Sequence, residues 1–92
     1  MTSTFEPVGE NLTVAVYPNP ANDFVHVRMN TAEATDVKVT LYSVDGRLLQ
    51  SQDVKAIGEM NVPMNVSTLA EGFYFLHVQA DGNVYTEKLV IK

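Results

Sequence analysis

The chain has 92 residues, 46% of them hydrophobic, and carries six Lys and Arg against eleven Asp and Glu, for a net charge of −5. This length supports one globular domain with its own core, and the apolar share excludes a disordered chain. Because the cations are scattered, a surface for nucleic acid or for an anionic membrane is disfavoured. The absence of cysteine excludes disulfides, thiolate metal sites and thiol nucleophiles.

Residues 1–11 show no periodic pattern, and we expect them to form a linker or an appended segment ahead of a domain at residues 12–92. Residues 1–4 have neither the basic nor the apolar region of a signal peptide, which is typical of a fragment excised from a longer protein. The linker is also where we expect a peptidase to cut, because cleavage needs extended, unpaired backbone.

The first predicted strand, residues 12–17, leads into a corner that contains Pro18, Asn19 and Pro20. Both prolines fix φ and lack a backbone N–H group, so this segment cannot lie inside a regular sheet. Asn19 suits a turn because its side chain bonds to nearby backbone. The corner precedes a second strand at residues 24–29, whose Val and Met side chains should face the core.

The clearest alternation of apolar and polar side chains lies at residues 37–44, and the Asp45–Gly46 pair after it predicts a tight hairpin turn. The partner strand should occupy residues 47–54. We expect a polar loop before this hairpin and a turn after it, at residues 30–36 and 56–59.

The remaining strands are predicted at residues 60–65, 73–80 and 84–92. Pro63 favours an edge position for the first of them, whereas the apolar strand at residues 73–80 should be central. Strands of this kind bury their apolar faces by packing two sheets together. The sequence therefore predicts an all-β fold, a seven-stranded immunoglobulin-like antiparallel β-sandwich.

Candidate catalytic groups are few and do not converge. His26 and His77 alternate with apolar neighbours on the outer faces of two strands, which favours solvated surface histidines. Asp45 is explained by its turn. Because the sequence has no phosphate loop, nucleophile elbow or paired-histidine motif, we expect no enzyme activity, no catalytic residue, no cofactor and no metal site.

Phe73 and Phe75 share one face of a strand whose other face is also apolar. Either the strand is buried on both sides, or the two rings form an exposed stripe that a partner covers. We retain both residues as candidates for a partner surface.

Four segments occur in a distinctive order: Tyr-Pro-Asn-Pro-Ala at residues 17–21, a strand with an Asp-Gly turn at 39–47, Leu-Ala-Glu-Gly-Phe-Tyr at 69–74, and Glu-Lys-Leu-Val-Ile-Lys at 87–92. Together they resemble the type A C-terminal sorting domain of the type IX secretion system, also called the Por secretion system. This domain is found at the ends of cargo proteins in Bacteroidota. The resemblance spans residues 12–92.

The resemblance implies an immunoglobulin-like domain that acts as a secretion address and performs no chemistry itself. It implies cargo that passes through the periplasm, is recognised by the type IX translocon and outer-membrane shuttle proteins, and reaches the cell surface or the extracellular space. A sortase-like cysteine peptidase then removes the domain during attachment to the surface. Nucleic acid and direct membrane insertion are not implied, and a homodimer of the isolated domain is left open.

The residues expected to carry the signal lie near the end of the chain. Gly72 should adopt a backbone angle that a larger residue resists, and Tyr74 should pack beside the terminal strand. A receptor could grip this strand by strand addition or by capture of its carboxylate, although a purely structural role explains these elements equally well. The terminal residues concerned are Lys88, Leu89, Val90, Ile91 and Lys92.

The main alternative is a fibronectin III-like adhesion or carbohydrate-binding β-sandwich module. Such a module needs an aromatic platform or a calcium site, for which Phe73 and Phe75 are the candidates. Binding of polysaccharides to the isolated domain would favour this alternative.

Overall fold

The computed structural model describes residues 5–92, which form an antiparallel sheet of six strands. Over this range no helix has the length and apolar character needed to cross a membrane. The sheet order is β1-β2-β3-β5-β6, and β4 lies along the opposite side of β3. The strands are β1 (Glu6–Val8), β2 (Leu12–Tyr17), β3 (Phe24–Ser43), β4 (Leu48–Asn65), β5 (Gly72–Ala80) and β6 (Asn83–Ile91).

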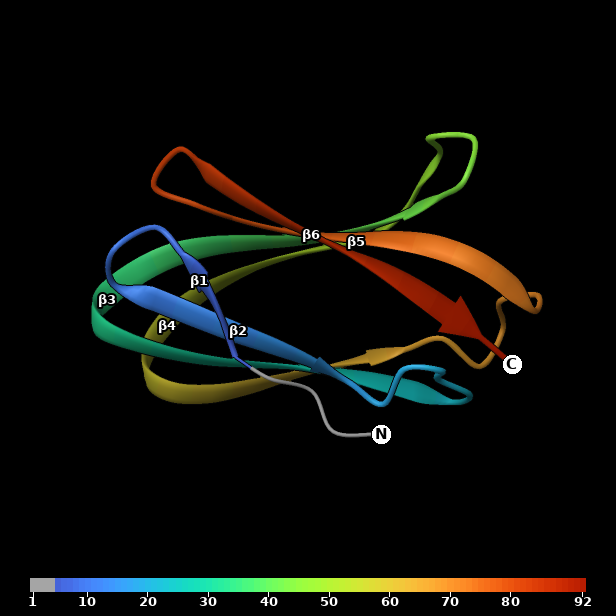
Figure 1. The fold of residues 1–92 in the computed structure, drawn as a ribbon, viewed down its shortest axis with the longest axis horizontal. Helices are drawn as coiled ribbons and strands as arrows, with labels where there is room; N and C mark the ends of the chain where they lie inside the picture. The colour runs from blue at the N-terminus through green and yellow to red at the C-terminus, as the bar shows by residue number, and fades with distance from the viewer. Residues whose placement is uncertain (1–4) are drawn as a thin grey trace.

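The two long strands, β3 with 20 residues and β4 with 18, bend together so that the sheet curls over on itself (Figure 1). The first part of β3 pairs with β2, whereas the part from Val37 to Ser43 pairs with β5. A register shift between Thr31 and Thr35 marks the bend. The inner faces of the two halves therefore share one hydrophobic core. Its largest fully buried side chains include Leu12, Met29, Leu41, Met64, Leu76 and Leu89.

The expectation of seven separate strands is not met, because the described residues form six. The predicted loop at residues 30–36 and the predicted turn at 56–59 are parts of β3 and β4. Thr31 and Thr35 are buried at the bend, and both hydroxyls donate to the carbonyl of Glu33, at 2.6 and 2.8 Å. This local bonding satisfies the buried hydroxyl groups, so a polar segment can continue the strand.

Part of the expected linker also belongs to the sheet. β1 pairs with β2, with Pro7 opposite Thr13, and Val8 is only 4% exposed. Residues 1–4, which we interpreted as the start of an excised fragment, lie outside the described residues.

Other predictions of local structure are confirmed. Val25, Val27 and Met29 are buried, as the alternation predicted. Pro63 lies in β4, whose one strand partner in the described part of the chain is β3, and β5 is central between β3 and β6.

Candidate recognition surface

The terminal strand β6 is built into the core by alternate side chains. Leu89 and Ile91 are 0% and 3% exposed, whereas Lys88 and Lys92 are exposed and Val90 is half-buried. β6 pairs with β5 through one of its edges, with Phe73 opposite Val90. Its other edge should therefore present every second N–H and C=O group to solvent or to a further partner.

That outer edge is occupied by Asn19, at the centre of the proline corner (residues 17–21). The Asn19 side chain donates from Nδ2 to the carbonyl of Lys88 at 2.9 Å and accepts at Oδ1 from the N–H of Val90 at 3.0 Å. Nδ2 also lies 3.3 Å from Oε2 of Glu87. One amide side chain thus pairs with the edge of β6 as a neighbouring strand would.

Ala21 continues this pairing with its own backbone. Its N–H donates to the carbonyl of Val90 at 2.7 Å, and its carbonyl accepts from the N–H of Lys92 at 2.9 Å. The contact is a parallel bridge opposite Ile91, and Ala21 is only 1% exposed. The outer edge of β6 from Lys88 to Lys92, named here the covered edge, is therefore already paired within the chain.

Glu87 supports the same contact from the inner side of β6. Its carboxylate accepts a hydrogen bond from the Tyr85 hydroxyl as well as from Asn19. Burial raises the pKa of the Tyr85 phenol, and the hydrogen bond and negative charge of Glu87 raise this pKa further. The phenol is therefore protonated at neutral pH and acts as the donor.

Gly72 and Tyr74 lie at the start of β5, opposite Ile91 and Leu89 of β6. Gly72 has φ of +148°, which confirms the predicted backbone angle. Tyr74 packs against the core, and its hydroxyl donates to the carbonyl of Ala70 at 2.6 Å. Both residues therefore contribute to the structure beside the terminal strand.

Phe73 projects from the outer face of β5 and is 52% exposed. The ammonium nitrogen of Lys88 lies 4.2 Å from the centroid of the Phe73 ring, a cation–π contact. Phe75, directly opposite Lys88 in the register, is half-buried. The stripe is therefore exposed mainly at Phe73, where a cation from the terminal strand lies over it.

The remaining polar candidates lie apart from the covered edge. His26 contacts Asn61 at 3.3 Å and stacks on Tyr17, whereas His77 contacts the Tyr42 ring with centroids 4.9 Å apart. Within residues 5–92, no three His, Cys, Asp or Glu side chains are placed to hold a metal ion.

Asp45 belongs to the hairpin turn between β3 and β4. Its carboxylate accepts a hydrogen bond from the Ser43 hydroxyl, and this bond holds the pKa of Asp45 below its ordinary value. Gly46 has φ of +86°, and its N–H donates to the carbonyl of Ser43 at 3.0 Å. The predicted Asp-Gly turn is confirmed.

Sequence reasoning identified both the proline corner and the terminal strand but did not predict that they contact each other. Asn19 and Val90 are 71 residues apart in the chain. Pro18 and Pro20 indicated where a regular strand stops, and this signal does not reveal which distant backbone Asn19 bonds. Asn19 was assigned to a local turn, whereas in the structure its side chain bonds to Glu87, Lys88 and Val90 of β6.

These features define a class of small all-β domain in which a corner before the first long strand, β3, pairs with the last strand, β6. Comparison with known families identifies the family to which this chain belongs. The model for the "Secretion system C-terminal sorting domain" matches residues 15–92, so the chain belongs to this family, which serves type IX secretion. The match spans the corner, the Asp-Gly turn and the terminal strand.

A solved structure shares the fold. A chain in the crystal structure of dimeric latent PorU from Porphyromonas gingivalis aligns with a TM-score of 0.68 and 20% sequence identity. The alignment covers 87% of this chain and 9% of the PorU chain, so this chain corresponds to a small part of that protein. A search of curated protein sequences found no match.

Proposed function

We propose that this domain is the C-terminal sorting signal of a cargo protein and that the export machinery recognises its folded surface. The family establishes a type IX sorting domain. The observation that carries the finer proposal is the bonding of Asn19 and Ala21 to Lys88, Val90 and Lys92. In this proposal the export machinery recognises the terminal strand only after the corner, which is distant in sequence, has folded against it.

This bonding favours one mode of recognition over another. Strand addition at the covered edge would have to displace Asn19 and Ala21, because they already bond Val90 on that side. Contact with exposed side chains needs no such displacement. We therefore favour a receptor surface that contacts Lys88 and Phe73.

The finer steps of the pathway are part of the same proposal. The domain would pass through the periplasm, bind outer-membrane shuttle proteins and the type IX translocon, and perform no catalysis. A sortase-like cysteine peptidase would then release it from cargo bound for the surface. Because β1 is paired and Val8 is buried, cleavage within β1 would require the sheet to unpair, so we place the cleaved bond before β1.

We also infer that the curled sheet is an immunoglobulin-like β-sandwich whose two layers are joined by the bends of β3 and β4. Three observations support this: the shared core, the change of partners along β3, and the shift at Thr31–Thr35. Strands that switch sheets through bulges are a known device of such packings.

Export of a reporter fused ahead of the chain, in a Bacteroidota host with an active type IX system, tests the proposal. Lys88→Ala and Phe73→Ala should fold normally but leave more reporter in the periplasm. Phe24→Ala is the matched control, because Phe24 is an aromatic residue of similar exposure, 46%, in the other half of the sheet. If both variants are exported as well as the control, the signal is not read at this surface.

A further inference from the structure

β4 forms a second edge of the sheet, and its two halves differ in how far they are protected from pairing with a further strand. Among residues 5–92, its strand partner is β3 alone. In the second half, Pro63 has no N–H to offer a further strand, and the carbonyl of Asn65 accepts from the Gln50 side chain at 2.6 Å. In the first half, residues 49–55 contain no proline. We name the outer side of residues 49–55 the open edge.

The direction of the backbone groups along the open edge follows from the hairpin. The N–H of Ser43 donates to the carbonyl of Arg47, so Ser43 faces β4. Alternate residues of β3 do the same, which makes Val37–Val54 and Val39–Gln52 the hydrogen-bonded pairs of this register. The N–H and C=O groups that point away from β3 therefore belong to Ser51, Asp53 and Lys55.

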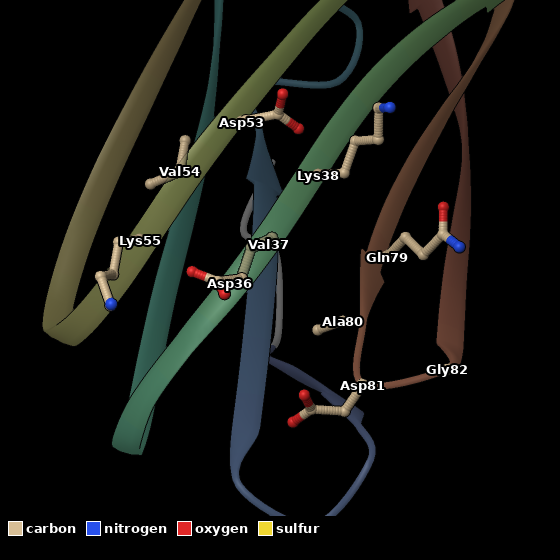
Figure 2. Close-up of a pocket in the computed structure, with 10 residues that line it drawn as sticks. All are labelled: Asp36, Val37, Lys38, Asp53, Val54, Lys55, Gln79, Ala80, Asp81 and Gly82. Carbon is tan, nitrogen blue, oxygen red and sulfur yellow. The ribbon is translucent and has the colours of Figure 1, made fainter.

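Charged side chains form an alternating pattern beside the open edge. Lys38 lies opposite Asp53, and Asp36 lies opposite Lys55. These four residues line part of a hollow of about 590 Å³, and Figure 2 shows their side chains. Asp53 and Lys55 are both exposed. The ion pair found within residues 5–92 joins Arg28 to Glu59, so neither Asp53 nor Lys55 is engaged in an ion pair there.

We propose that a second copy of this chain adds to the open edge, antiparallel and about a two-fold axis at Val54. This register places Asp53 opposite Lys55 of the second copy, and Lys55 opposite its Asp53. The row of side chains across the two copies then alternates in sign, from Lys38 through Asp53 to Lys55 and Asp36 of the second copy. The hydrogen-bonding groups of Asp53 and Lys55 point toward each other across this axis, as an antiparallel ladder requires.

Neighbouring registers are less favourable. An axis at Asp53 sets two aspartates directly opposite each other, and an axis at Lys55 does the same with two lysines, which destabilises a strand pair. An axis at Gln52 leaves both charged residues opposite uncharged ones. Charge complementarity thus selects the axis at Val54 and a copy of this chain as the occupant. This proposal does not depend on the proposed secretion function.

Sedimentation of the 92-residue chain over micromolar to millimolar concentrations tests the proposal. The wild-type chain should self-associate weakly, because an edge-to-edge contact is small. Asp53→Lys and Lys55→Asp should each weaken self-association by about tenfold, since each variant sets like charges opposite each other twice. Glu71→Lys and Lys92→Asp make the same charge changes away from the open edge and should associate like wild type.

An equimolar mixture of the two variants gives the sharper result. Asp53→Lys supplies two cations and Lys55→Asp supplies two anions, so the mixed pair restores both opposite-charge contacts. The mixture should associate where neither variant does alone, and high salt should reduce the difference. Melting curves of each variant check that it remains folded. A wild-type chain that stays monomeric at millimolar concentration, or a mixture no better than its components, would overturn the proposal.

Discussion

At one side of the curled sheet, the last strand β6 is paired by Asn19 and Ala21 from the proline corner; at the other side, residues 49–55 of β4 have no such partner within the described chain. Both are edge strands, which in general invite pairing with other chains. The covered edge uses a segment of its own chain as a substitute strand. The difference leaves the exposed side chains of β6, and not the backbone of its outer edge, available for contact, whereas the outward N–H and C=O groups of residues 49–55 have no such partner within the described chain.

The largest effect should come from removing the covered edge itself. Deleting residues 87–92 takes Leu89 and Ile91 from the core, a loss of about 3–6 kcal/mol in burial alone, against a typical total stability of about 5–15 kcal/mol. We expect the cooperative thermal transition to be lost. Adding a short Gly-Ser tail after Lys92 keeps the core intact and is the control. A truncated chain with a normal melting curve would show that β6 is dispensable for folding.

Proline substitutions on β4 should distinguish residues whose N–H points outward from residues whose N–H bonds β3. At Ser51 the N–H points outward, on the side of β4 where Pro63 has no N–H, so Ser51→Pro should cost less than about 1 kcal/mol. At Gln52 the N–H bonds β3, so Gln52→Pro should cost about 3 kcal/mol or more. Chemical denaturation measures both values. Equal costs at the two positions would contradict the assigned direction of the backbone groups.

Removing the Asn19 side chain should loosen the covered edge without emptying the core. Asn19→Ala loses the bonds to Lys88 and Val90, and we expect a cost of about 1–3 kcal/mol. Asn22→Ala is the matched control, because Asn22 is exposed in the same loop. Equal stability of the two variants, measured by denaturation, would mean that the corner does not secure β6.

The smallest effect concerns alkaline pH. The ordinary pKa of Tyr85 is 10.0, and burial with the Glu87 hydrogen bond raises it in the folded state. The folded chain therefore keeps a proton that the unfolded chain has lost, so this contribution is complete below about pH 10 and declines as the pH rises above that value. Between about pH 9 and pH 11, wild type should lose more thermal stability than Tyr85→Phe. If the thermal stabilities of wild type and Tyr85→Phe fall in parallel over this range, Tyr85 does not contribute to the pH dependence of stability.

Local pattern predicted local structure well in this chain. Alternation gave the buried faces of residues 24–29 and 37–44, and Asp45–Gly46 gave the hairpin. The continuation of β3 through residues 30–36 and of β4 through residues 56–59 was not predicted. The composition of these segments is typical of loops, and their pairing depends on the two strands bending together. The contact between Asn19 and Val90 was missed because it links distant segments through a side chain and so leaves no periodic signal in the sequence.

Amide hydrogen exchange, followed residue by residue by NMR on dilute, monomeric protein, tests the comparison most directly. The N–H of Val90 bonds Asn19, so it should be strongly protected although it lies on the outer edge of the last strand. The N–H groups of Asp53 and Lys55 point to solvent and should exchange rapidly. In Asn19→Ala, protection at Val90 should fall while exchange at Asp53 stays the same. Rapid exchange at Val90 in the wild-type chain would contradict the claim that the proline corner covers this edge.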